Sequence, residues 1–170
     1  IEQEVEATDT SHWKMAELSM TMWACGKRGY SSRTLLSKFA NEMRERRPCN
    51  CTSQELANFC WALSEAKFPA PDVFREVVRT CCDRSMVQTS PRDVRNILLC
   101  MAKVNAPALG LCQPIADDLL RNREGGHVSV KSFVQCMWSF AHLRYPAPPD
   151  LVQLFETRIL ASKLPPYADR

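Results

Sequence analysis

The chain has 170 residues, of which 45% are hydrophobic and 24% charged, and its formal net charge is +3. These proportions are near the averages for globular domains and indicate a well-packed chain. No apolar run approaches the roughly 18 residues of a membrane-spanning helix, so we expect no membrane contact. The sequence begins at Ile1 without a visible targeting segment, so we expect a processed form or part of a longer protein.

A phrase of similar sequence recurs along the chain at a nearly constant spacing. Its equivalent positions lie 38, 38 and 39 residues apart, at Trp23, Trp61, Leu99 and Trp138. A period of this length indicates a repeated supersecondary unit whose copies bury their apolar faces against one another. The sequence therefore predicts an all-α fold, an α-solenoid of about four stacked helical hairpins.

Each predicted hairpin has a first helix that contains the phrase, a short turn and a second helix. The four repeats are expected at about residues 14–48, 52–86, 90–124 and 129–162, within one repeat domain that covers residues 1–170 with short tails. The second helices have apolar residues at helical spacing, such as Val73, Val77 and Cys81. We expect these helices at about residues 33–46, 72–83, 111–122 and 150–161.

Two of the first helices have residues that favour a helix start. Thr52 and Glu55 have the spacing of a capping box, in which each side chain accepts a hydrogen bond from the other residue's backbone N–H. Ser90 and Asp93 have the same spacing, and Pro91 stands at the first helical position. These pairs predict the starts of the first helices in the second and third repeats.

Basic residues are concentrated in one segment. Between Lys27 and Arg47 there are seven basic and two acidic residues, which gives a local charge of +5. Such a segment could bind an anion, and it could equally be the solvated face of a second helix.

The nine cysteines and three histidines form no recognisable metal or catalytic motif. Cys60, Cys100 and Cys136 fall among apolar residues of the first helices, where a free thiol packs as a small hydrophobic group. The spacing of a structural zinc site, a nucleophile motif and a phosphate-binding glycine loop are all missing. We therefore expect no metal, no cofactor, no small-molecule substrate and no enzymatic activity, and we expect reduced thiols in a reducing compartment.

The first helices carry a narrow polar stripe on an otherwise apolar surface. At 100° per residue, Gln54, Asn58 and Glu65 fall within about 40° of one another. The stripe recurs in the other repeats and forms rows: Gln54, Arg92 and Lys131; Asn58, Asn96 and Gln135; Lys27, Glu65, Lys103 and His142; and, near the helix ends, Lys67, Asn105 and Arg144. Amides can bind base edges while Arg and Lys neutralise phosphates, so the stripe suits single-stranded RNA. An ordinary solvated stripe, or a surface that binds a peptide or another subunit, would show the same pattern.

The phrase of the second repeat, Gln-Glu-Leu-Ala-Asn-Phe-Cys-Trp-Ala-Leu at residues 54–63, resembles the octotricopeptide repeat signature, in which Pro-Gln-Glu-Leu-Ala-Asn leads into Trp-Ala-Leu. It is also similar to related repeats of organellar proteins that often carry a C-terminal RAP domain. The third repeat keeps Pro91 and Asn96 but has Leu99 in place of the tryptophan, and no RAP-like segment follows Ala161. The resemblance implies a right-handed solenoid that binds RNA in mitochondria or chloroplasts.

The stripe and the resemblance together predict an organellar RNA-binding repeat protein. The short array and modest charge favour a structural subunit of a mitochondrial ribosome, which contacts single-stranded rRNA segments and neighbouring ribosomal proteins. The alternative is a protein-binding scaffold subunit of another organellar complex. We expect it in the mitochondrial matrix, with the plastid as the alternative. The candidate RNA-binding residues are Lys27, Arg28, Arg44, Arg46, Arg47, Asn58, Lys67, Arg92, Asn96, Lys103, Lys131, Gln135 and Arg144.

Overall fold

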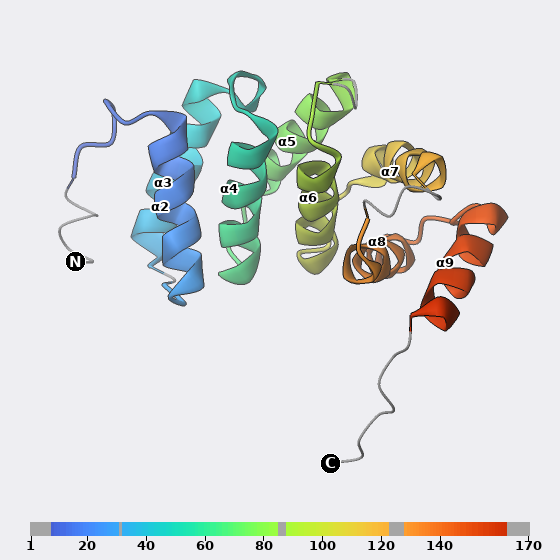
Figure 1. The fold of residues 1–170 in the computed structure, drawn as a ribbon. Coiled ribbons are helices and arrows are strands. Elements are labelled where there is room, and N and C mark those ends of the chain that lie inside the picture. The colour runs from blue at the N-terminus through green and yellow to red at the C-terminus, as the bar shows by residue number, and fades with distance from the viewer. Residues whose placement is uncertain (1–7, 31, 85–87, 123–127, 163–170) are drawn as a thin grey trace, which may run out of the picture.

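The computed structural model describes residues 8–30, 32–84, 88–122 and 128–162, which form helices and turns (Figure 1). The helices are α2 (Met15–Lys27), α3 (Arg33–Arg46), the short 3-10 helix η1 (Pro48–Asn50), α4 (Ser53–Glu65), α5 (Pro71–Asp83), α6 (Pro91–Lys103), α7 (Leu109–Arg121), α8 (Val130–His142) and α9 (Pro149–Ala161). The predicted all-α fold is confirmed. Each second helix begins and ends within two residues of its predicted bounds. The predicted repeat ends at residues 86 and 124 lie outside the described residues.

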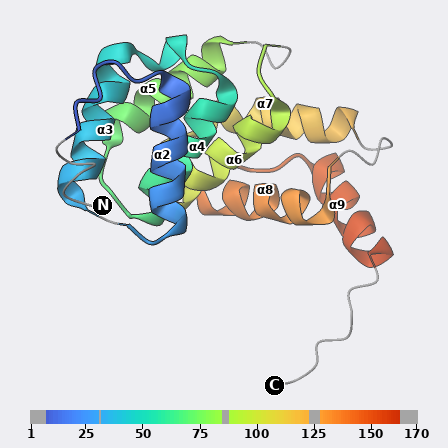
Figure 2. The ribbon, with the colours of Figure 1, turned by 60° about the vertical axis from the view of Figure 1, so that its left-hand side comes forward.

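The helices pack as an α-solenoid of hairpins in two layers. The first helices α2, α4, α6 and α8 form one layer, and the second helices α3, α5, α7 and α9 form the other. Successive first helices lie closer together than successive second helices. The helix axes also turn along the stack, because α2 runs upright in Figure 1 while α8 is seen nearly end-on there and lengthwise in Figure 2.

Small residues explain why the first helices approach one another so closely. A Cβ atom on Gly26 would lie 2.9 Å from the Trp61 ring and 3.2 Å from the Cα of Ala62, so α2 and α4 meet almost backbone to backbone here. The equivalent positions in the later repeats also hold small residues, namely Ser64, Ala102 and Ala141. The close contact is therefore a property of the repeat.

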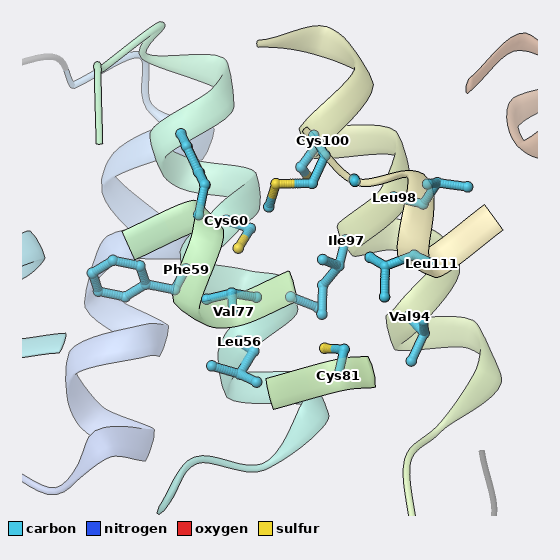
Figure 3. Close-up of a cluster of buried hydrophobic side chains, with 14 of the residues drawn as sticks. Leu56, Phe59, Cys60, Val77, Cys81, Val94, Ile97, Leu98, Cys100 and Leu111 are labelled. Carbon is cyan, nitrogen blue, oxygen red and sulfur yellow. The ribbon is translucent and has the colours of Figure 1, made fainter. Parts of the chain in front are cut away.

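The core lies between the two layers and is continuous through the stack. Figure 3 shows Val77 of α5, Ile97 of α6 and Leu111 of α7 close together in its central part, with the ring of Phe59 from α4 extending to the other side. All four side chains are buried. Complete burial of side chains of this size contributes roughly 1.5–3 kcal/mol each, so the core, and not helix propensity, holds the hairpins together.

The cysteines of the first helices belong to this core, as the sequence predicts. Cys60, Cys100 and Cys136 are buried. Removal from water raises the pKa of the Cys100 thiol to about 11 and that of Cys136 to about 12, because burial disfavours the thiolate. These residues are neutral packing groups in the folded chain.

The predicted starts of α4 and α6 are both confirmed, but only α4 forms its capping box, and the capping box predicted at α6 is wrong. The backbone N–H of Thr52 donates to Glu55 Oε2 at 2.7 Å, and that of Glu55 donates to Thr52 Oγ1 at 3.3 Å. At α6, the Ser90 side chain makes no capping bond. Ser53 of the preceding repeat instead donates its hydroxyl to Asp93 Oδ2 (3.0 Å) and accepts the Ser90 N–H (3.3 Å). Aspartate is one methylene shorter than glutamate, and the neighbouring hydroxyl bridges the difference.

Each first helix ends in the same left-handed turn. The second residue after the helix has a positive φ in all four repeats: 73° at Gly29, 49° at Lys67, 54° at Asn105 and 57° at Arg144. The next N–H then donates to the carbonyl five residues earlier at 2.8–2.9 Å, for example from Tyr145 to Phe140. This pattern is the Schellman motif, and it fixes the direction in which the chain enters the second helix.

The two ends of the solenoid differ. At the N-terminal end, residues 8–14 lie against α3: Trp13 packs on Phe39 with ring centroids 6.4 Å apart, and the buried Thr10 donates its hydroxyl to Glu42 at 3.0 Å. At the other end, α9 buries only Leu151 completely. Its side chains include exposed apolar groups, which leave this end partly uncovered in the described part of the chain.

Candidate nucleic-acid interface

The predicted amide row lies on the surface of the first-helix layer. Asn58, Asn96 and Gln135 hold equivalent positions on α4, α6 and α8; Asn96 is exposed, and the other two are half-buried. Because α4 packs on α6 and α6 on α8, the three amides follow one another along the stack. On α2 the position holds Met20, whose sulfur lies 3.8 Å from Asn58 Nδ2.

Aromatic side chains flank the amide row. The indole of Trp23 is 37% exposed and that of Trp138 is 45% exposed, while Trp61 is half-buried against α2. The rings of Trp23 and Trp61 lie 6.3 Å apart, and Trp138 stacks on His142 at 4.8 Å. Exposed flat rings of this kind can stack with nucleic-acid bases. The sequence predicted that these tryptophans are equivalent but did not predict that they form a surface row.

The third row of the stripe is linked from one repeat to the next. Lys27 Nζ lies 5.5 Å from the centre of the Trp23 ring and 4.9 Å from that of Trp61, so its charge is held by two cation–π contacts. Lys103 forms an ion pair with Glu65 of the preceding repeat. The ring nitrogen Nε2 of His142 lies 2.9 Å from Oδ1 of Asn105. The charges of the two lysines in this row are therefore partly compensated by contacts within the protein, which leaves them less available to a ligand.

Four exposed basic residues of the rows remain without a partner. In the ranges that the structure describes, no hydrogen bond or ion pair holds Arg92 and Lys131 near the starts of α6 and α8, or Lys67 and Arg144 just after the ends of α4 and α8. They lie on the two sides of the amide row, toward the starts and toward the ends of the helices, where they could meet an anion that follows the layer.

The basic segment from Lys27 to Arg47 does not form one patch. Lys27 and Arg28 are at the turn before α3, whereas Arg44, Arg46 and Arg47 are at its far end, about 20 Å along a helix of this length. Arg44 is held by Asn41 at 3.1 Å. The three arginines at the far end of α3 therefore lie away from the amide row, whereas Lys27 belongs to the third row on the first-helix layer.

Arg46 has a structural role. Its guanidinium pairs with Glu42 (Nε to Oε2, 2.9 Å) and donates to the backbone carbonyls of Thr10 (2.7 Å) and Trp13. The side chain is only 22% exposed. Its donors hold residues 8–14 on α3, so they are not available to a ligand.

The structure shows two grooves that sequence reasoning missed. Both lie at the edge where first helices end and second helices begin. One, of about 650 Å³, lies between the turns of the second and third repeats, and the other, of about 470 Å³, lies between those of the third and fourth. The recurrence of Phe-Pro-Ala-Pro at residues 68–71 and Ala-Pro at residues 106–107 is the signal that could have indicated them.

Neither a metal centre nor a known relative assigns a ligand to this surface. The described residues contain no group of three or more His, Cys, Asp or Glu placed to hold a metal ion. None of the helices described here combines the length and apolarity needed to cross a membrane. No protein-family model, curated protein or solved structure matches the chain.

Proposed function

We propose that the protein binds single-stranded RNA across the surface of its first-helix layer. The observation that carries the proposal is the row of Asn58, Asn96 and Gln135 beside partly exposed tryptophans. Side-chain amides can hydrogen-bond the edges of unpaired bases, and indole rings can stack on their faces. Both contacts require bases that are free of a duplex, which is why the proposed ligand is single-stranded.

The repeat spacing supports one base for each repeat. Packed helices lie about 8–10 Å apart, and helical-repeat proteins that read RNA meet one base per repeat with two or three side chains. The amides of α4, α6 and α8 would then meet three successive bases. Trp23, Trp61 and Trp138 would lie beside these bases.

The charge of the surface supports only weak binding by the chain alone. This surface can neutralise at most four phosphates, one for each of Lys67, Arg92, Lys131 and Arg144, and at that limit log K falls against log salt with a slope of about −2.8. The affinity would then drop about 50-fold between 50 and 200 mM salt. An RNA site of this strength needs further contacts from an assembly.

We therefore propose a structural subunit of a mitochondrial ribosome that contacts rRNA and neighbouring ribosomal proteins, in the mitochondrial matrix or, alternatively, the plastid. The support is the resemblance of residues 54–63 to the octotricopeptide repeat signature, together with the small number of unpartnered cations on the surface.

A second candidate function is a protein-binding scaffold in another organellar complex. It is favoured by the apolar side chains at the C-terminal end: Val134 of α8 is 40% exposed, and Val152 and Leu160 of α9 are 37% and 84% exposed. Apolar side chains exposed at the last repeat of a stack can meet a partner protein. A ribosomal subunit would use both surfaces, whereas a pure scaffold would not need the amide row.

The test compares two sets of amide substitutions. Asn58, Asn96 and Gln135 are replaced together by alanine, and the matched control replaces the exposed second-helix amides Asn41, Gln113 and Gln153. We expect affinity for single-stranded RNA from the organelle to fall about tenfold or more in the first set and to stay within about twofold in the control. Equal affinities in both sets would contradict the proposal.

Crosslinking in intact organelles separates the two candidate functions. Discrete rRNA crosslinks to the first-helix layer support the RNA-binding proposal. Recovery of protein neighbours through α9, with no RNA attached to the first-helix layer, would favour the scaffold.

A further inference from the structure

We propose that the edge of the solenoid where the hairpins turn carries the phosphate backbone of the bound RNA, with Lys67 and Arg144 as its phosphate contacts. This inference rests on the proposed function, because it assigns the path of the same ligand. It adds to that function the orientation of the bound RNA, whose bases lie toward the amide row and whose backbone lies toward the turns.

The two grooves at this edge are equivalent by the repeat. The larger one lies between residues 67–71 of the second repeat and residues 103–107 of the third, and the smaller one lies between residues 105–110 of the third and residues 142–144 of the fourth. Lys67 and Asn105 stand on the two sides of the first groove, and Asn105 and Arg144 on those of the second. The two grooves share residues 105–107 and so follow one another across three repeats. Their walls are largely apolar, and the positive charge beside them comes from Lys67, Lys103 and Arg144.

The residues beside the grooves occupy a backbone conformation that is costly for them. Lys67 and Arg144 have φ values of 49° and 57°, a region in which a Cβ atom crowds the following carbonyl oxygen. Glycine has no such cost, and Gly29 occupies the equivalent position in the first repeat. The Schellman motif requires this conformation, so the choice of a lysine and an arginine over glycine at these two turns costs stability and points to a use for their side chains.

The contacts around the grooves leave these two cations available. Glu65, the acidic neighbour in the larger groove, is paired with Lys103, and His142 in the smaller one is bonded to Asn105. Neither Lys67 nor Arg144 has a hydrogen-bond or ion-pair partner among the described residues. Both side chains are long and flexible, which suits contact with a backbone that follows the track.

The amide row lies on the same layer, at a distance from Lys67 and Arg144 that one nucleotide and one extended side chain together can span. Lys67 follows Asn58 by nine residues, about 13 Å along the axis of α4, and Arg144 follows Gln135 by nine residues on α8. The equal offset means that phosphate and base contacts keep the same register in both repeats.

Another explanation must be separated from this one. A basic residue after the end of a helix also interacts favourably with the negative end of the helix dipole. In that case Lys67 and Arg144 would stabilise the fold, and replacing them with glycine would lower the melting temperature. If the side chains serve the RNA, glycine relieves the strain, and we expect a rise of about 2 °C for each substitution.

The experiment measures the binding of a short, unstructured oligouridine by the 170-residue chain at several salt concentrations. We expect the slope of log K against log salt to become shallower by about 0.7 in Lys67→Gly and in Arg144→Gly, and by about 1.4 in the double variant. The conservative variants Lys67→Arg and Arg144→Lys should keep the original slope. Arg121→Ala, on the second-helix layer, is the control and should also keep it.

The outcomes distinguish this inference from the proposed function. If the wild-type chain binds the RNA and the double variant keeps the wild-type slope, the backbone track is wrong while the RNA-binding proposal stands. If the wild-type chain binds no RNA, both fail. A shallower slope with an unchanged or higher melting temperature supports the track, and a lower melting temperature with an unchanged slope assigns the two residues to helix capping alone.

Discussion

The two layers of the solenoid use the same kinds of polar residue in different ways. On the second-helix layer, Arg75 pairs with Asp72, and Arg79 pairs with Glu76 and Asp83, all within α5. On the first-helix layer, Lys103 pairs with Glu65 and His142 bonds to Asn105, each from one repeat to the next. The charged and polar pairs of the first-helix rows therefore join successive repeats, whereas the ion pairs of α5 stay within one helix. The second-helix layer has links between repeats as well, through Gln113 and Arg158.

The close packing of the first helices is the physical reason. Small residues such as Gly26 bring neighbouring helices near enough for surface side chains to meet across the gap. Long side chains on the more separated second helices find partners three or four residues away on their own helix. A ligand that spans several repeats therefore meets an ordered surface on the first layer.

The largest expected effect comes from alkaline pH, which acts on both layers. Burial raises the pKa of Cys100, Cys112 and Cys136 to about 11, 11 and 12, above the usual value near 8.5 of an unfolded chain. Their stabilising contribution is complete below about pH 8.5 and is lost as the pH rises toward the folded values. Each thiol should cost the fold about 2 kcal/mol at pH 10.

Denaturant unfolding at pH 8, 9 and 10 measures this loss, with circular dichroism as the probe of both layers and tryptophan fluorescence as the probe mainly of the first. Coincident transitions would mean that the layers unfold together. Separate transitions would show that the first-helix layer is a unit of its own. Constant stability up to pH 10 would contradict the burial of the thiols.

A pair of glycine substitutions compares how closely neighbouring helices pack within the first layer and within the second layer. Gly26→Ala places a Cβ atom 2.9 Å from the Trp61 ring, and we expect it to lower the free energy of unfolding by about 1–2 kcal/mol. Gly110→Ala on α7 meets only the flexible sulfur of Cys82 at 3.0 Å, so we expect a change of less than about 1 kcal/mol. Equal costs, measured by thermal or urea unfolding, would show that the layers are packed alike.

A glycine substitution in a left-handed turn should change the free energy of unfolding by a smaller amount and should stabilise the fold. Lys67→Gly should raise the free energy of unfolding by about 0.5–1 kcal/mol, because the Cβ strain at φ 49° disappears. Gly29→Ala makes the reverse change at the equivalent turn of the first repeat and should lower it by a similar amount. Urea unfolding of both variants checks the pair; a destabilised Lys67→Gly would argue for a capping role of the lysine.

The smallest expected effect concerns the ion pair between repeats. Lys103 and Glu65 are each a little over one third exposed, so a double-mutant cycle should give a coupling of about 0.5 kcal/mol. The coupling should shrink in 0.5 M salt because solvent ions screen it. Zero coupling at low salt would mean that this contact does not hold the register of the first layer.

Much of the fold could be predicted because the sequence repeats with a nearly constant period. The spacing of Trp23, Trp61 and Trp138 predicted the number and kind of repeats, and helical angles placed Asn58 and Asn96 on a common stripe. These inferences need only the geometry of one helix and its recurrence. The RNA ligand itself stays a prediction.

Contacts between repeats could not be predicted in the same way. Arg46 was predicted to bind RNA because it is a basic residue in a basic segment. Its actual partners, the backbone carbonyls of Thr10 and Trp13, are more than thirty residues away in the sequence. Asp93 was assigned to its own helix because the capping spacing was present, while its actual partner is Ser53. The packing of one helix beside another decides such contacts, and the sequence of a single helix does not contain it.

The segment over α3 has a consequence for self-association. If both ends of a helical stack were uncovered, the apolar end of one molecule could join the opposite end of the next, and head-to-tail contacts of this type extend without limit into fibres. Here residues 8–14 cover part of α3, where Trp13 packs on Phe39 and Arg46 donates to the carbonyl of Thr10. A head-to-tail contact on this part of α3 would have to displace residues 8–14 first, which makes open-ended growth by that route less favourable.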